Sequence, residues 1–273
     1  MPRAISMFAA LALMTAPAMA LAAPEPFYQA TGEHERSYVL KPAGETRPYR
    51  IYVPTTWKPG IHLPLVVVLH GGGSDQDRPF KGTPRYPDIL QQQAQAHGYI
   101  VVAPLGDKEI GADIAYGNTL HAPWSDDVPP TPQDARRNTL SELDVLAVLD
   151  RTVAEYGVDK RRIYLAGNSM GEIGGLWLAQ ERPRTFCAIA LAGGPLKASE
   201  YPFAKTRYLS GAMIINGDRD LDALEPNRAM ADGFKAAGVD TEFYLVPFSD
   251  HGGAFFHALP QAFDFFDKHR CAA

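Results

Sequence analysis

The sequence has little excess charge of either sign. Its 26 Lys and Arg residues stand against 31 Asp and Glu residues, so the formal net charge is -5 over 273 residues. Proteins that bind nucleic acid commonly present a basic face or stripe, and anionic membranes select clusters of Lys and Arg. The composition therefore argues against nucleic acid and anionic membrane surfaces as partners.

Cysteine is scarce as well, since the chain has only Cys187 and Cys271. Two cysteines cannot make a zinc site of the usual spacing. They could form a disulfide. Cys187, however, falls in a strand that we expect to be buried, where cysteine commonly serves as a small hydrophobic side chain. The sequence favours this second interpretation of Cys187.

Long apolar runs are absent except near the N-terminus. Residues 4–23 contain two polar side chains and follow a positively charged residue, and the run ends in two overlapping small-x-small sites. This pattern predicts a secretory signal peptide over residues 1–22, cut after Ala20 or Ala22, and a secreted or periplasmic protein. A membrane anchor is the alternative, but Pro17 interrupts the run and leaves it short of the ~20 residues that a membrane-spanning helix needs.

The remainder of the chain alternates short apolar runs with stretches of helical spacing. Expected central strands occupy residues 63–70, 99–104, 162–166, 187–192, 212–216 and 241–246. Expected helices occupy residues 88–96, 139–156, 170–180, 227–237 and 259–269. Strand runs without polar alternation are typical of a parallel sheet buried on both faces. The pattern predicts one doubly wound α/β domain over residues 23–273, with a mostly parallel sheet.

Two segments depart from this alternation. Residues 37–40 and 49–53 are β-rich and separated by a turn-like stretch, so we expect them to pair antiparallel at the N-terminal edge of the sheet. Residues 106–137 are rich in Gly, Pro and Asp and also carry aromatic side chains. A segment of this length is either a cap or rim over a functional site or a simple surface insertion, and we expect the first.

The strongest motif in the chain is Gly167-Asn168-Ser169-Met170-Gly171. It follows an expected buried strand and precedes an expected helix, which is the context of a nucleophile elbow. The serine of such an elbow occupies a tight turn, and glycine two positions before and after it relieves steric crowding. The alternative is that Ser169 merely caps the following helix.

A second motif, His70-Gly71-Gly72-Gly73, ends the first central strand. Consecutive glycines expose backbone N–H groups, so we expect Gly72, with Gly73 as the alternative, to supply one donor of an oxyanion hole. Met170 would supply the other. We expect His70 to be a structural hydrogen-bonding residue. A phosphate-binding loop is excluded because neither of its glycine patterns is present.

A third motif, residues 216–222, supplies three candidate acids in a loop after a strand, namely Asp218, Asp220 and Asp222. The alternating aspartates also suggest a calcium loop. With Asp218 as first ligand, however, the sixth position is Ala223 rather than Gly and the twelfth is Ala229 rather than Glu. We therefore expect no metal site.

The candidate base is His251, which follows the last expected strand and precedes two glycines. His257 is the rival, and we expect it to lie near or inside the final helix. The chain order Ser169, acid, His251 is that of α/β-hydrolases and differs from the order in chymotrypsin-like and subtilisin-like proteases.

These motifs, together with Tyr49-Arg50-Ile51-Tyr52-Val53-Pro54, resemble those of α/β-hydrolase-fold serine esterases. The similarity is to the secreted branch of polyhydroxybutyrate-depolymerase-like and feruloyl-esterase-like enzymes and predicted peptidases. It covers residues from about 38 to 269. It implies that the acid is the third residue after the loop glycine, Asp220. The chain departs from the pattern at Glu172, where members often have glycine, and in lacking a Val-Pro pair after the acid, so Asp222 stays an alternative.

The resemblance implies a serine hydrolase that cleaves small or polymeric carboxylic esters through an acyl-enzyme. Such an enzyme uses a Ser169–His251–Asp220 triad and no cofactor. A prolyl-type peptidase is the alternative enzyme, and a non-catalytic binding protein of the same fold is the alternative from another class. Tyr116, Trp124 and Trp177 are candidates for stacking on substrate, although Trp177, within an expected helix, is better explained by packing. The sequence leaves the identity of the ester and the oligomeric state open.

Overall fold

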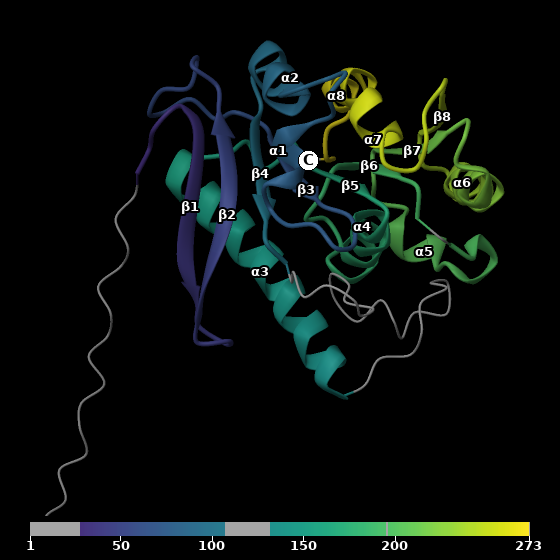
Figure 1. The fold of residues 1–273 in the computed structure, drawn as a ribbon, viewed down its shortest axis with the longest axis horizontal. Coiled ribbons are helices and arrows are strands. Elements are labelled where there is room, and N and C mark those ends of the chain that lie inside the picture. The colour runs from purple at the N-terminus through teal and green to yellow at the C-terminus, as the bar shows by residue number, and fades with distance from the viewer. Residues whose placement is uncertain (1–27, 107–131, 195, 273) are drawn as a thin grey trace, which may run out of the picture.

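A computed structural model describes residues 28–106, 132–194 and 196–272 of the chain (Figure 1). The predicted signal peptide, and Tyr116 and Trp124 with most of the expected 106–137 insertion, lie outside these described residues.

The fold is built on one eight-stranded sheet with the order β1-β2-β4-β3-β5-β6-β7-β8. The strands are β1 (Gly32–Leu40), β2 (Glu45–Val53), β3 (Leu65–Leu69), β4 (Ile100–Pro104), β5 (Ile163–Asn168), β6 (Ala188–Ala192), β7 (Gly211–Gly217) and β8 (Thr241–Val246). β1 pairs antiparallel with β2, and β2 with β4, whereas all other pairs are parallel. The predicted mostly parallel sheet with an antiparallel N-terminal edge is confirmed.

Helices cover both faces of the sheet (Figure 1). They are α1 (Arg78–Lys81), α2 (Ile89–His97), α3 (Pro132–Tyr156), α4 (Met170–Glu181), α5 (Phe203–Thr206), α6 (Leu221–Ala236), α7 (Ala254–His257) and α8 (Leu259–Lys268), with a 3₁₀ turn η2 at Ala198–Glu200. Side chains of α3, α4 and α6 form one hydrophobic core with the sheet, and those of α2, α7 and α8 form the other.

The central strands explain why the sheet is covered on both sides. In β3, Val67 and Leu69 belong to one core, and Val66 and Val68 belong to the other. All four are fully buried. Because successive side chains of a strand point to opposite faces, an uninterrupted apolar run requires helices on each face.

The start of α6 differs from the sequence prediction. The expected helix begins at residue 227, directly after Pro226, and proline lacks the N–H that a helix interior uses. The observed helix begins at Leu221 and contains Pro226. The helix therefore gives up one backbone hydrogen bond near its start, and its first turn lies directly after the loop that carries the candidate acids.

The interpretation of Cys187 as an unpaired hydrophobic residue was wrong. Cys187 directly precedes β6 and is buried, yet it forms a disulfide with Cys271, with the two Cα atoms 4.7 Å apart. After α8 the chain end returns to the N-terminal ends of β5 and β6, where the Cys271 N–H donates to the Arg161 carbonyl oxygen over 3.0 Å. Burial was predicted correctly, but it does not exclude pairing when the chain end packs over the same strand.

Across the three described ranges, every helix is too short or too polar to cross a lipid bilayer.

Candidate active site

Loops from four strands meet at one end of the sheet. β3, β5, β7 and β8 run parallel within the sheet, so the loops that follow them leave it at the same edge. Ligand sites of open α/β sheets lie at this carboxyl end. The candidate residues from all four sequence motifs occupy these loops.

Ser169 sits on a strained bend between β5 and α4. Its φ of 57° and ψ of -116° place it where side-chain-bearing residues are rarely found. A Cβ at Gly167 would collide with the carbonyl of Gly171, and a Cβ at Gly171 would collide with the carbonyl of Leu69 in β3. The turn therefore requires glycine at both positions. Ser169 occupies the N-cap position of α4, but its side chain makes no capping hydrogen bond.

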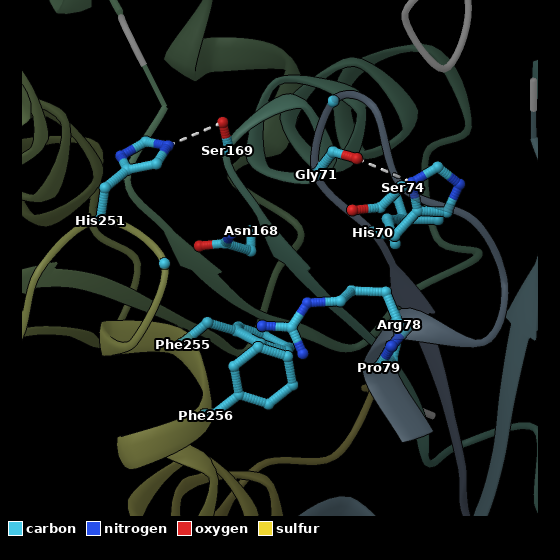
Figure 2. Close-up of a pocket in the computed structure, with 13 residues that line it drawn as sticks. His70, Gly71, Ser74, Arg78, Pro79, Asn168, Ser169, His251, Phe255 and Phe256 are labelled. Carbon is cyan, nitrogen blue, oxygen red and sulfur yellow. Dashed lines mark hydrogen bonds between the residues drawn. The ribbon is translucent and has the colours of Figure 1, made fainter. Parts of the chain in front are cut away.

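The Ser169 side chain instead faces a histidine (Figure 2). The His251 Nε2 atom lies 2.9 Å from Ser169 Oγ, and His251 Nδ1 lies 2.7 Å from Asp220 Oδ2. The imidazole is 48% exposed, whereas the Asp220 side chain is only 11% exposed. The structure thus brings these three side chains together in one hydrogen-bonded chain.

The rival candidates occupy other positions. Asp222 lies in the first turn of α6, and Asp218 Oδ1 accepts the Ser249 N–H over 3.1 Å, which ties the loop after β7 to the loop after β8. His257 lies in α7, with its Nδ1 2.6 Å from Ser249 Oγ.

A buried amide pair that the sequence analysis did not assign holds the loop of Asp220. Asn216 Nδ2 donates to the backbone carbonyl of Asp220 over 2.9 Å, and Asn227 Nδ2 donates to Asn216 Oδ1 over 2.8 Å. Both asparagines are fully buried. A polar residue at the end of an apolar strand was the available signal for Asn216, whereas Asn227 is recognisable only through its contact.

The glycine-rich loop after β3 lies beside the serine. Gly72 lines the same cavity as Ser169, and a Cβ there would meet no atom within 4 Å. The glycine-rich loop comes close to the serine turn at Gly71, where a Cβ would lie 3.3 Å from the Asn168 carbonyl oxygen. Met170 begins α4, so its N–H has no acceptor within the helix.

His70 is buried below the glycine loop. Its Nε2 lies 2.7 Å from the Leu105 carbonyl oxygen and its Nδ1 lies 2.9 Å from that of Gly71. Burial lowers its pKa. A neutral imidazole has one N–H and donates to one of these two carbonyls, and its burial against the backbone agrees with the expected structural role.

The cavity at Ser169 measures about 280 Å³. Part of its wall comes from residues that the sequence analysis did not single out, namely Arg78, Pro79, Phe255 and Phe256 (Figure 2). They lie on the short helices α1 and α7, which carry no motif. Trp177 is not among the residues that line the cavity; it packs against the hydrophobic core, and its Nε1 donates to Glu142 Oε2 over 3.0 Å.

Glu172, where the sequence departs from the family pattern, lies in the first turn of α4, directly after the serine bend. It is fully buried, and its Oε2 accepts the N–H of Gly194 over 2.5 Å. Its Oε1 has no hydrogen-bond partner among the described residues. Burial, together with a smaller effect of the nearby charge of Asp220, raises the pKa of Glu172 to about 8, although the hydrogen bond from the Gly194 N–H opposes the shift. The carboxyl is therefore mainly protonated at neutral pH.

This burial predicts a pH-dependent stability. The folded-state pKa of about 8 exceeds the ordinary value of 4.5, so between these pH values the unfolded chain releases a proton that the folded chain keeps. The contribution of Glu172 is then complete below pH 4.5 and is lost as the pH rises to about 8, by up to about 1.4 kcal/mol per pH unit. Glu172→Gln keeps an acceptor for the Gly194 N–H but has no proton to lose. Its free energy of unfolding, measured with denaturant, should therefore exceed that of the wild type by a margin that grows from pH 5 to pH 8.

The matched control is Glu242→Gln, which removes an exposed carboxylate on β8. Its free energy of unfolding should follow the wild-type curve across the same pH range. Parallel curves for Glu172→Gln and the wild type would contradict the assignment of a protonated Glu172.

Comparison with known proteins places these features in a family. A model of the Esterase family, described as "Putative esterase", matches residues 42–232, which include Ser169 and Asp220 and end before His251. No curated protein matches the chain.

Solved structures share the fold. The chain is similar to a ferulic acid esterase (18% identity, TM-score 0.67), covering 86% of this chain and 98% of that one. It is also similar to LpqC, a poly(3-hydroxybutyrate) depolymerase from Bordetella parapertussis (22% identity, TM-score 0.58), covering 89% of this chain and 93% of that one. A thermostable esterase matches with 20% identity and a TM-score of 0.64 over 87% of this chain, which spans 63% of that longer chain.

The family match extends over more than half of the chain, and the solved structures share its sheet and helices. The protein therefore belongs to the Esterase family and is a carboxylic ester hydrolase with the α/β-hydrolase fold.

Proposed function

We propose that Ser169, His251 and Asp220 are a catalytic triad that hydrolyses carboxylic esters through an acyl-enzyme. The observation that carries this proposal is the chain of two hydrogen bonds from Ser169 Oγ through the His251 imidazole to Asp220. This arrangement suits nucleophilic catalysis, because an unassisted serine hydroxyl is a weak nucleophile and needs an adjacent base.

In the proposed reaction, Ser169 Oγ attacks the ester carbonyl carbon while its proton passes to His251 Nε2. Asp220 orients the imidazole and stabilises its protonated form. As the tetrahedral intermediate collapses, the bond to the leaving alcohol breaks and His251 gives the proton to the alcohol oxygen. Water then attacks the acyl-enzyme by the same proton transfers and releases the carboxylic acid and free Ser169.

The N–H groups of Gly72 and Met170 are the proposed donors to the oxyanion. Supporting this role, Gly72 lines the cavity at Ser169, and Met170 directly follows the nucleophile at the start of a helix, whose N-terminus favours negative charge. A donor of this kind typically contributes a factor of about 10² to 10³ in rate.

We also propose that the protein is secreted or periplasmic. The signal-peptide pattern of residues 1–22 supports this, as does the Cys187–Cys271 disulfide, because disulfides persist in oxidising compartments.

Covalent labelling tests the proposed nucleophile. A fluorophosphonate should react with the purified protein and leave its phosphonyl group on Ser169, as peptide mapping by mass spectrometry would detect. Ser249 is a demanding control, because its Oγ also contacts a histidine, His257, over 2.6 Å. Ser249→Ala should still be labelled and Ser169→Ala should not. Labelling of Ser249, or of no serine, would contradict the proposal.

A further inference from the structure

A second hollow adjoins the cavity at Ser169. This groove measures about 510 Å³ and is bordered by the loops after β7 and β8 and by residues that follow α1. Arg78 and Gly252 line both the groove and the cavity, so the two spaces are contiguous. In Figure 2 the Arg78 side chain extends across the cavity towards Phe256. A substrate held at Ser169 can therefore extend past Arg78 into the groove.

The groove collects positive charge from three separate segments, in Arg78, Arg85 and Arg219. Within the part of the chain that the structure describes, none of the three forms an ion pair with a carboxylate. This local positive charge contrasts with the net charge of -5 of the whole chain. Arginine pairs readily with carboxylates, so three arginines left without one along a groove favour an anionic ligand.

Each arginine is held by an aromatic ring instead. The guanidinium carbon of Arg78 lies 4.4 Å from the ring centre of Phe256. That of Arg85 lies 5.3 Å from the ring of Tyr86, and that of Arg219 lies 5.6 Å from the ring of Phe248. Stacking on a ring orients the guanidinium plane and leaves N–H groups at its edge for a ligand. On Arg78, Nη1 already donates to the Gly82 carbonyl oxygen.

The other titratable groups lining the groove do not cancel this charge. Among the described residues that line it, Asp250 is the one carboxylate, and its Oδ1 already accepts the N–H of Gly253 over 2.8 Å. His257 adds no positive charge at neutral pH, because partial burial and the charge of Arg85 lower its pKa despite the opposing effect of Asp250. The groove keeps an excess of positive charge.

Phe248 on the groove rim provides an independent observation. Its side chain is 72% exposed, and its backbone has a φ of 55°, a conformation that is unfavourable for a residue with a bulky side chain. Neither feature stabilises the fold. Strained backbone and exposed aromatic rings are both enriched at binding sites.

We propose that this groove binds a free carboxylate on the substrate, so that the enzyme prefers esters that carry a second, ionised carboxyl group. This inference rests on the proposed triad, since it places the scissile ester at Ser169. The carboxylate would pair with Arg85 and Arg219 while Arg78 spans the junction with the cavity.

Matched substrates test the preference. Mono-4-nitrophenyl adipate and 4-nitrophenyl hexanoate have six-carbon acyl groups and differ in the terminal carboxylate. 4-Carboxyphenyl butyrate and 4-carbamoylphenyl butyrate make the same comparison on the alcohol side. We expect the wild type to show a higher kcat/KM for the carboxylate-bearing member of at least one pair. Raising the salt concentration should reduce the advantage because Arg85 and Arg219 are exposed.

The double variant Arg85→Gln/Arg219→Gln should lower the ratio of kcat/KM, charged over neutral ester, by about 5- to 10-fold, mainly through KM. The matched control is Arg184→Gln/Arg207→Gln, which removes two arginines from a cavity beside Cys271, remote from the Ser169 loop. This control should leave the ratio unchanged.

The outcomes separate the two proposals. If the neutral ester is hydrolysed but neither pair shows a preference, or if both double variants change the ratio equally, the groove proposal is overturned and the triad stands. If the wild type hydrolyses none of the four esters, the proposed function fails and the groove proposal fails with it.

Discussion

Replacing Ser169 with alanine is expected to lower kcat for ester hydrolysis by a factor of about 10⁵ to 10⁶. The variant keeps the backbone and removes one oxygen atom, the one that His251 Nε2 contacts over 2.9 Å. Without that oxygen no acyl-enzyme can form, so only the oxyanion donors and substrate binding remain to assist direct attack by water. Steady-state kinetics with 4-nitrophenyl butyrate measures the loss.

The result is meaningful only if the variant folds. The Ser169 side chain caps no helix and the substitution adds no atoms, so the melting temperature should stay close to that of the wild type. Ser249→Ala provides the comparison for losing a serine that contacts a histidine, and it should keep most of the activity. A folded Ser169→Ala protein with wild-type turnover would exclude Ser169 as the nucleophile.

Replacing Asp220 with asparagine is expected to reduce kcat by about 10⁴-fold. The carboxylate Oδ2 lies 2.7 Å from His251 Nδ1 and can accept its N–H. An asparagine amide can instead donate to Nδ1, which favours the tautomer with the proton on Nε2. That nitrogen then cannot accept the proton of Ser169.

Asp222→Asn tests the same chemistry two residues away. Asp222 lies in the first turn of α6, where its charge interacts favourably with the helix N-terminus. Its loss should therefore lower stability by about 0.3 to 1 kcal/mol and leave kcat nearly unchanged. Measuring kcat for both variants across a pH range ranks the two acids, and a larger loss for Asp222→Asn would reassign the role.

The contrast between the two aspartates shows how far sequence reasoning reaches. The sequence restricted the acid to one loop. The apolar run at residues 212–216 marks the end of a strand, and the candidate aspartates follow it directly. The residue types alone could not decide among the aspartates of that loop, and the family resemblance favoured Asp220 while leaving Asp222 as an alternative. Contacts formed in the folded loop help to fix which carboxylate faces His251: the Asn216 amide holds the Asp220 carbonyl, and Asn227 of α6 holds Asn216.

Glu172 shows the same limit in energetic terms. The sequence marked it as an unusual charge near the serine, in a position where family members often have glycine. The structure buries it completely against Gly194, where burial raises its pKa to about 8. A sequence records the residue type, whereas the protonation state depends on the solvent and the charges that surround the folded side chain.

Local properties of the sequence determined the strands, most of the helices and the tight bend at Ser169, because these depend on the period of apolar residues and on glycine at fixed spacings. Tertiary structure alone decided that Cys187 meets Cys271 and that three arginines from separate segments border one groove, and it placed Asp220, which the family resemblance favoured over Asp222, against His251. These outcomes join residues far apart in the chain, and their spacing in the sequence carries no information about distance until the sheet has formed.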